Sequence, residues 1–315
     1  MSLSSTPIPD LTAPYDVTIV GGGPAGLSAA LLLGRARKRV LLLDAGTPRN
    51  ARAHEVHGFV TRDGTPPAEF RRLAHEQLTA YPSVTRASQL VERITGEVEA
   101  FHLQLQAGTR VRSRRVLLAL GMVDVLPALP GYRELWGSSL FQCPYCHAWE
   151  EQDKAFGFLA PGPDKMEFGA FLLGWTADVT VFTDARFEVP AVIRASLEAA
   201  GVQLEERPIR RLVSRTGDDV HGDRLEAVEL VDGTRIAREV LFVRPPQRQT
   251  ALVEAMGLAL DQNGFVQVDA RQETSCRGIF AAGDMTTQMQ SAMTAAAAGY
   301  QAAAMLNHDL MVAPR

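Results

Sequence analysis

The sequence lacks the features that tie a protein to a membrane or a nucleic acid. No stretch approaches about 18 uninterrupted apolar residues, which excludes an ordinary membrane-spanning helix. The first 14 residues are polar and lack the charged region and apolar run of a signal peptide. Lys and Arg form no block or stripe, and the formal net charge is -4 with a pI near 6.0. We therefore expect a cytoplasmic protein that binds neither membrane nor nucleic acid and acts on a small molecule or a protein.

Cysteine is also scarce, since only Cys143, Cys146 and Cys276 occur. Structural disulfides are rare in a reducing cytoplasm, so the CxxC spacing of the first two indicates catalysis or metal binding rather than a covalent staple. We expect Cys276 to be inert. No short-period repeat or low-complexity tract is evident either, which leaves an ordinary globular chain.

The length and composition predict two domains. A chain of 315 residues that is 46% hydrophobic exceeds the usual size of one core. Two Pro/Gly-bearing stretches, at 121–131 and 242–249, follow strand-like runs and are interpreted as crossings between domains. Residues 1–120 and 246–315 then form one discontinuous domain, and residues 121–245 form a second domain inserted into it. Strands alternate with helices in both, which predicts an α/β fold for each.

Two elements of the inserted domain are predicted from local patterns. Apolar residues at 165–175 favour a helix. The runs 225–231 and 236–243, joined by Asp232-Gly233, favour a hairpin of two strands.

A glycine loop near the start has the pattern of a dinucleotide site. Gly21, Gly23 and Gly26 form GxGxxG directly after the strand-like run 15–20 and open an apolar helix. Such glycines let the backbone approach a pyrophosphate, and the helix N-terminus stabilises its charge. Asp44 ends the next strand, where it can accept a hydrogen bond from a ribose hydroxyl. The predicted cofactor contacts here are Gly21, Gly23, Pro24, Ala25, Gly26 and Asp44.

A distant segment favours FAD over NAD. Residues 278–284, which end in Gly283-Asp284, resemble the second FAD signature of flavoproteins with two dinucleotide-binding domains. In that signature the Asp binds the ribityl chain, and the next helix points its N-terminus at the flavin. A helix dipole so placed stabilises negative charge on a reduced flavin.

The segment Cys143-Pro144-Tyr145-Cys146-His147 has three interpretations. CxxCH is the attachment motif of c-type haem, but haem is attached outside the cytoplasm. A structural zinc site needs four ligands, and the sequence has no second CxxC. Dithiol/disulfide exchange needs only the pair, with His147 accepting or returning a proton and supplying positive charge beside a thiolate. We rank exchange first, zinc second and haem last, and we predict no metal site.

Together these motifs resemble the low-molecular-weight thioredoxin reductases over residues 15–307. The segments 44–50, 57–59 and 143–150 look more closely like the branch that includes dithiol oxidases of disulfide-containing natural products. Typical thioredoxin reductases have an Asp after the second cysteine, where this chain has His147. The resemblance implies two Rossmann-like domains, a homodimer, Cys146 facing the flavin and Cys143 exchanging with the substrate. It also implies cofactor contacts at Ala45, Asn50, His57, Gly121, Gly283, Asp284, Ser291 and Ala292.

The expected NADPH site departs from the family pattern. Its glycine fingerprint reads Ala160-Pro161-Gly162-Pro163-Asp164-Lys165, so the first glycine is lost and a lysine occupies the close helix-packing position. The next strand ends near Asp184 and Arg186, without a basic cluster for the 2′-phosphate, and Asp184 would repel that group. We interpret Arg186 as a solvated surface charge. NADPH is therefore expected to reduce the flavin slowly or not at all.

These observations predict an FAD-dependent thiol/disulfide oxidoreductase in which Cys143, Cys146 and His147 are catalytic. The leading hypothesis is a dithiol oxidase that uses O2 or another partner in place of NADPH. One alternative is a thioredoxin reductase that reduces a thioredoxin-like protein with electrons from ferredoxin or NADPH. An alternative of another class is a flavin redox sensor without turnover.

Overall fold

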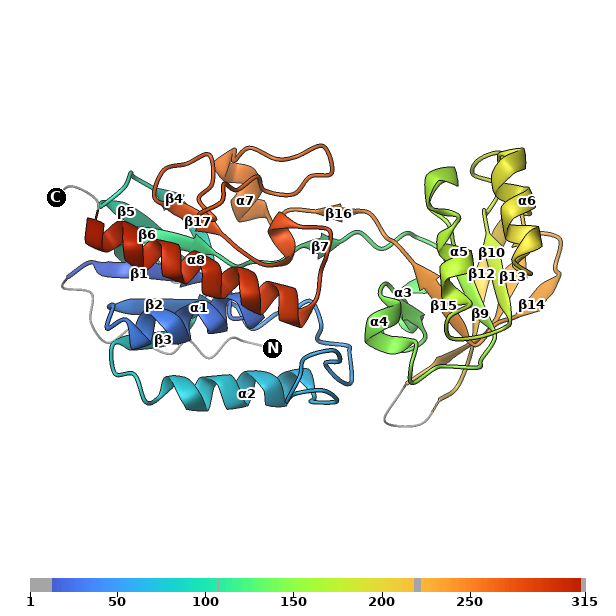
Figure 1. Cartoon of the computed structure of the whole chain (residues 1–315), viewed down its shortest axis with the longest axis horizontal. Coiled ribbons are helices and arrows are strands. Elements are labelled where there is room, and N and C mark those ends of the chain that lie inside the picture. The colour runs from blue at the N-terminus through green and yellow to red at the C-terminus, as the bar shows by residue number, and fades with distance from the viewer. Residues whose placement is uncertain (1–12, 107, 218–221, 313–315) are drawn as a thin grey trace. The chain divides into compact units, whose positions relative to one another are not determined.

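The computed structural model describes residues 13–106, 108–217 and 222–312 (Figure 1). The polar start from which we inferred the lack of a signal peptide lies, up to residue 12, outside the described residues. The chain forms two compact units. The first unit contains the described residues up to Ala51, Phe59–Val123 and those from Gln247 on, and the second contains Arg52–Gly58 and Asp124–Pro246. The second unit is thus largely an insertion in the first, and a short earlier segment joins it.

A mixed sheet forms the centre of the first unit. Its strands are β1 (Tyr15–Val20), β2 (Val40–Asp44), β3 (Val84–Ser88), β4 (Val91–Thr95), β5 (Phe101–Leu105), β6 (Arg110–Leu118) and β17 (Ile279–Ala281). The strand order is β3-β2-β1-β6-β5-β4, and β17 pairs with β6. The pairs of β1, β2, β3, β6 and β17 are parallel, while β4 and β5 form an antiparallel excursion. The parallel strands therefore end at one edge, which in such sheets is the usual ligand edge.

Helices cover the sheet because its strands alternate apolar residues between two faces. Val17 and Ile19 of β1 pack with α1 (Pro24–Arg35) and α8 (Ala292–Val312) on one face, where α2 (Pro67–Leu78) also contributes its last residue. Val20 of β1 and Leu41 and Leu43 of β2 lie in the core of the other face, with α7 (Ala251–Met256). Figure 1 shows α8 lying along the sheet beside α1.

The second unit contains a parallel sheet of order β11-β10-β9-β15-β8. These strands are β8 (Leu140–Phe141), β9 (Phe156–Leu159), β10 (Val179–Phe182), β11 (Gln203–Glu205) and β15 (Val240–Val243). A separate antiparallel sheet joins β12 (Ile209–Arg215), β13 (Arg224–Leu230) and β14 (Arg235–Ala237). The helices are α3 (Tyr132–Leu135), α4 (Pro144–His147), α5 (Phe168–Leu172) and α6 (Ala191–Ala199), with 3₁₀ turns η1 (Pro163–Lys165) here and η2 (Asp284–Thr286) in the first unit.

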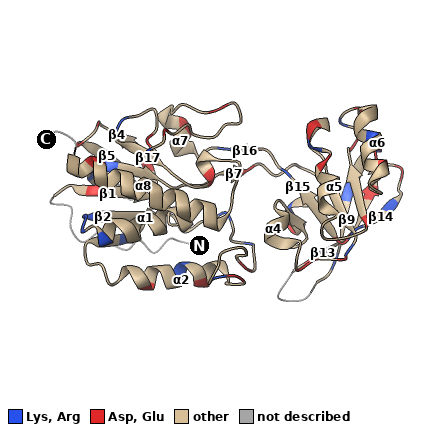
Figure 2. Cartoon of the chain, viewed as in Figure 1, with Lys and Arg blue, Asp and Glu red and all other residues tan. Residues whose placement is uncertain are grey.

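The two connecting segments pair with each other. A two-stranded sheet joins β7 (Val123–Asp124) to β16 (Gln247–Arg248), and the N–H of Val125 donates to the carbonyl of Pro246 at 2.8 Å. In each unit, basic and acidic residues are interspersed in the view of Figure 2.

The structure corrects two of the predicted elements. The hairpin turn lies at Asp232-Gly233 as expected, but 236–243 is not one strand. It divides at Arg238, which is buried, pairs with Asp178 at 2.7 Å and also donates to Thr180, so the chain passes from the hairpin into the parallel sheet. The helix predicted at 165–175 is shorter, because α5 covers only Phe168–Leu172 and Gly174, a poor helix former, follows it.

Candidate active site

The loop after β1 requires glycine at two positions. Gly21 has a φ of +114°, and a Cβ there would lie 2.1 Å from the carbonyl oxygen of Ala119. A Cβ on Gly26 would lie 1.9 Å from the carbonyl oxygen of Gly21. The absence of a Cβ on Gly21 lets the loop approach Ala119 just after β6, and its absence on Gly26 lets the first turn of α1 pack against the loop.

Gly23 has a different environment. It is the N-cap of the twelve-residue helix α1, and a Cβ built on it meets no atom within 4 Å. Its backbone therefore faces open space where the helix N–H groups and dipole favour an anion. Asp44 borders this loop, because a Cβ on Gly22 would lie 2.7 Å from the Asp44 Oδ2. The cradle fits a pyrophosphate, with a carboxylate beside it for ribose hydroxyls.

The second FAD-type segment contacts the same helix. Gly283 has a φ of +84°, and a Cβ there would lie 3.1 Å from the Cβ of Ala25 in α1. Asp284 accepts a hydrogen bond from Arg49 Nη1 at 3.0 Å. Arg49 also donates to Gln290 Oε1 at 2.6 Å. Arg49 was absent from the predicted site, because nothing local relates positions 235 residues apart in sequence.

The start of α8 is capped next to this segment. The N–H of Thr294 donates to Ser291 Oγ at 3.1 Å, so Ser291 acts as an N-cap and Ala292 begins the helix. Further along, a Cβ on Gly299 would lie 2.0 Å from the carbonyl oxygen of Ala25. The N-terminal half of α8 is thus held against the α1 turn that follows the glycine loop.

The remaining predicted cofactor contacts are distributed over both units. Ala45 follows β2, Asn50 is exposed in the next segment, and Gly121 follows β6 at the ligand edge with a φ of +65°. His57 instead belongs to the second unit, where its Nε2 lies 3.2 Å from Glu55 and 3.5 Å from Glu150. A cofactor contact of His57 stays a prediction.

The redox motif follows a short strand of the second unit. After β8, Cys143 caps the single turn α4, and the Cys146 N–H donates to the Cys143 carbonyl at 3.3 Å. The two residues are thiols here. The pKa of Cys143 is lowered, first by a hydrogen bond from the Cys146 thiol and then by backbone N–H groups of Cys146 and Tyr145 and the charge of Arg244, while burial opposes the shift. The arrangement favours a Cys143 thiolate.

His147 does not supply the positive charge that we expected of it. Its ring stacks on Phe141 with centroids 4.2 Å apart and planes 9° apart. Burial is the main cause that lowers the pKa of His147 to about 4, although the Cys143 carbonyl acts in the opposite direction. Both ring nitrogens are buried without a hydrogen bond of good geometry in the described part of the chain. At neutral pH His147 is an uncharged base beside the cysteines.

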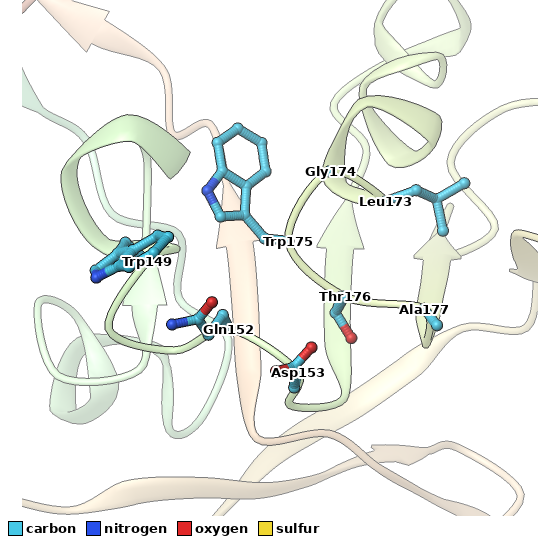
Figure 3. Close-up of a pocket in the computed structure, with 8 residues that line it drawn as sticks. All are labelled: Trp149, Gln152, Asp153, Leu173, Gly174, Trp175, Thr176 and Ala177. Carbon is cyan, nitrogen blue, oxygen red and sulfur yellow. The ribbon is translucent and has the colours of Figure 1, made fainter.

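Aromatic side chains lie next to the redox motif. Tyr145, between the two cysteines in sequence, is 72% exposed and makes edge contacts with Phe171 at 5.9 Å and Trp175 at 5.8 Å. A cavity of about 340 Å³ opens between the segment after α4 and the segment after α5 (Figure 3). It is lined by Trp149, Gln152, Asp153, Leu173, Gly174, Trp175, Thr176 and Ala177. Tyr145 and Trp175 thus form an aromatic surface next to the redox motif, and Trp175 also lines the cavity.

The second unit does not form a nucleotide cradle like that of the first unit, at the position where the sequence departs from the family pattern. Gly162 is extended, and the chain continues into η1 and then a helix of only five residues. Lys165 pairs with Asp164 at 2.9 Å. Asp184 accepts the Ile209 N–H at 2.6 Å and pairs with Arg186 at 2.7 Å, so Arg186 is engaged by a carboxylate rather than being merely a solvated charge. These contacts disfavour a nicotinamide dinucleotide with a 2′-phosphate.

Two features are absent from the described residues. No helix in them is long and apolar enough to cross a membrane. Across 13–106, 108–217 and 222–312, no group of three or more His, Cys, Asp or Glu side chains is arranged to hold a metal ion.

Residues 15–299 match the family model described as pyridine nucleotide-disulphide oxidoreductase. The chain belongs to this family. The fold class is thereby confirmed as two Rossmann-type α/β domains of the thioredoxin reductase-like flavoproteins, and the resemblance to those enzymes is confirmed as well. The protein is a thioredoxin reductase-like oxidoreductase acting on sulfur groups.

Similar proteins support this family membership over nearly the whole chain. The thioredoxin reductase tcpT of Claviceps purpurea is 31% identical, with 94% of each chain covered. The thioredoxin reductase aclD of Aspergillus oryzae is 33% identical, with 92% of this chain and 94% of the relative covered. A crystal structure of an oxidoreductase from Agrobacterium tumefaciens is 36% identical with a TM-score of 0.89, covering 96% of this chain and 100% of that one.

Proposed function

We propose that the protein is an FAD-dependent dithiol oxidase that passes electrons from a substrate dithiol through Cys143 and Cys146 to FAD, and from there to O2 or another acceptor that is not NADPH. The observation that carries this proposal is the contrast within the second unit. Its CxxC pair favours a thiolate, whereas its nucleotide cradle has lost the glycine turn and pairs its charged residues with one another.

The residues of the first unit have distinct binding roles in this proposal. The loop from Gly21 to Gly26 and the N-terminus of α1 hold the pyrophosphate, and Asp44 accepts from the adenosine ribose. Asp284, which Arg49 orients, would bind the ribityl chain of FAD. The start of α8 would stabilise negative charge on the flavin ring. When bound, FAD supplies the two-electron acceptor chemistry.

The cysteines exchange with the substrate in two balanced steps. One substrate thiolate attacks the Cys143 sulfur of the oxidised pair, which breaks the bond to Cys146 and releases a Cys146 thiolate. The second substrate thiolate then attacks the first substrate sulfur and releases Cys143 as a thiolate. The substrate becomes a disulfide and the pair receives two electrons as two thiolates, while the two protons given up when the substrate thiols ionise go to solvent or to these thiolates. His147, whose pKa is lowered to about 4, is a weak base at neutral pH, so in this proposal it acts through packing beside the cysteines more than as the proton acceptor.

A small-molecule substrate is supported by the surroundings of the cysteines. The cavity beside Trp149 and Trp175 has a volume of about 340 Å³, which lies in the range of small-molecule sites. The exposed Tyr145 adds an aromatic face inside the motif itself.

A thioredoxin reductase activity is the second candidate. It is favoured by the names of tcpT and aclD, both thioredoxin reductases. In that case electrons would flow from ferredoxin or NADPH through FAD to the cysteines and then to a thioredoxin-like protein. A cytoplasmic location and a homodimer remain proposals based on composition and on the family resemblance, and light scattering of purified protein tests the dimer.

Anaerobic reduction separates the candidates. The purified flavoprotein is mixed in parallel with NADPH, NADH and small dithiols, its flavin absorbance is followed, and air is then admitted. We expect dithiols to bleach the flavin, air to restore it, and both nucleotides to act slowly or not at all. Rapid saturable bleaching by micromolar NADPH would instead assign an ordinary thioredoxin reductase, and a flavin inert to dithiols and oxygen would favour a redox sensor.

A further inference from the structure

The register of two strands brings an arginine to the redox motif. Strands β8 and β15 are parallel, with Leu140 opposite Leu241 and Phe141 opposite Phe242. Cys143 lies two residues after Phe141, and Arg244 lies two residues after Phe242. Neighbouring strands lie about 4.8 Å apart, so continuing the register places the two residues next to each other at the carboxyl edge of the sheet.

Arg244 is a partly buried cation that rests on an aromatic ring. Its guanidinium lies over the ring of Phe168, 4.5 Å from the centroid. Its Nε is buried and has no hydrogen-bond partner in the described chain. Burial lowers the pKa of Arg244, and the negative charge of a Cys143 thiolate raises it. The guanidinium nevertheless stays protonated, as arginine does in proteins. Among the described residues, no carboxylate contributes to this pKa, as an ion-pair partner would.

Apart from Arg244, the groups that act on Cys143 carry no full positive charge. On α4 they are the Cys146 thiol, the backbone N–H groups of Cys146 and Tyr145, and His147, whose pKa is lowered to about 4. From β15 the group is Arg244, and α5 contributes the uncharged ring of Phe168 on which Arg244 rests. The fixed cation of this site therefore comes from the far end of the inserted unit in sequence, not from the motif itself.

We propose that Arg244 is a positioning residue that stabilises the thiolate of Cys143, the sulfur that exchanges with the substrate. The inference rests on the proposed function only in assigning exchange to Cys143. When a dithiol is oxidised, the bond between Cys143 and the substrate sulfur breaks, and its electron pair leaves on Cys143. When a disulfide is reduced, the same Cys143 thiolate attacks. Arg244 assists in both directions because both pass through that anion.

Alkylation of a single thiol tests this role without any turnover. The background is Cys146→Ala with Cys276→Ser, which leaves Cys143 as the only cysteine and removes the hydrogen bond from Cys146. The rate of reaction with iodoacetamide is measured from pH 5 to 10 with Arg, Lys, Gln or Met at position 244. Arg210→Gln is the matched control, since Arg210 is 65% exposed and lies on β12 of the same unit.

In Arg244→Gln and Arg244→Met, the midpoint of the pH dependence of the alkylation rate should shift upward by about one pH unit. The reaction at neutral pH should be roughly tenfold slower. Arg244→Lys should restore most of the reactivity, and Arg210→Gln should change nothing. Arg244→Met keeps an apolar contact with Phe168 in case the polar variant unfolds, and flavin content with melting temperature reports folding. An unchanged midpoint in a folded variant that lacks the charge overturns the inference. Failure of dithiol oxidation would leave this result intact, because alkylation needs neither flavin nor oxidant.

Discussion

Substituting Gly23 separates cofactor binding from folding. Its φ of -77° is accessible to alanine, and a Cβ there meets no protein atom within 4 Å. Gly23→Ala should therefore change the stability of the apoprotein by no more than about 1 kcal/mol, because the lower entropy of the unfolded chain and the poorer N-cap act in opposite directions. The new methyl group would occupy the space facing the α1 N-terminus, so we expect the Kd for FAD to rise at least about tenfold, or about 1.4 kcal/mol.

Alanine substitutions at two other glycines serve as comparisons for Gly23→Ala. Gly26→Ala would bring a Cβ to within 1.9 Å of the Gly21 oxygen, so it should destabilise the apoprotein itself by about 1–3 kcal/mol. Gly162→Ala makes the same change at the corresponding position of the degenerate loop, where the nearest atom is the flexible Asp164 carboxylate at 3.0 Å. It should affect neither property.

The assay combines thermal unfolding of flavin-free protein with fluorescence titration of FAD. The expected pattern is normal unfolding with weak FAD binding for Gly23→Ala, a lowered unfolding temperature for Gly26→Ala, and unchanged values for Gly162→Ala. Normal FAD affinity in Gly23→Ala would refute the assignment of this loop as the pyrophosphate cradle.

Two further predictions concern the second unit. The pKa of His147 is about 4 when folded and near 6.5 when unfolded, so the unfolded state gains the proton first and stability should fall between about pH 6.5 and 4. In His147→Phe, the free energy of unfolding measured with urea should fall less between these pH values. An unchanged slope of this free energy against pH would contradict a buried neutral ring. Tyr145→Ala and Trp175→Ala should each raise the KM for an aromatic dithiol about two- to tenfold while kcat changes little; Val192→Ala on exposed α6 is the control, and unaltered KM values would argue against the aromatic surface.

The local features of the first unit were predictable from sequence. The run 15–20, the glycine loop and Asp44 lie within 30 residues. The residue type at each position accounts for its backbone conformation, as glycine does for the positive φ of Gly21. The hairpin turn at Asp232-Gly233 was predictable for the same reason.

Features set by distant pairing were not predictable. The run 236–243 is mostly apolar, so its pattern cannot reveal that buried Arg238 divides it between two sheets. Arg49 reaches Asp284 only because of the sheet order, and Arg244 reaches Cys143 only through the register with β8, a strand of two residues without a periodic signal. Burial of the His147 nitrogens is likewise a property of packing, which the CxxCH pattern does not encode.

The most direct test of the proposed relay is the absorbance spectrum of the two cysteine variants with FAD bound. In the proposed relay Cys146 is the sulfur that faces the flavin, so for Cys143→Ser we predict a long-wavelength charge-transfer band, loss of turnover and full flavin content. Cys146→Ser should lack the band, retain flavin and, when given the disulfide form of the substrate, accumulate a mixed disulfide, because its Cys143 thiolate displaces one substrate thiolate and no second protein thiol remains to release it. Reversed spectra would exchange the roles of the cysteines, and normal turnover in both variants would contradict the relay.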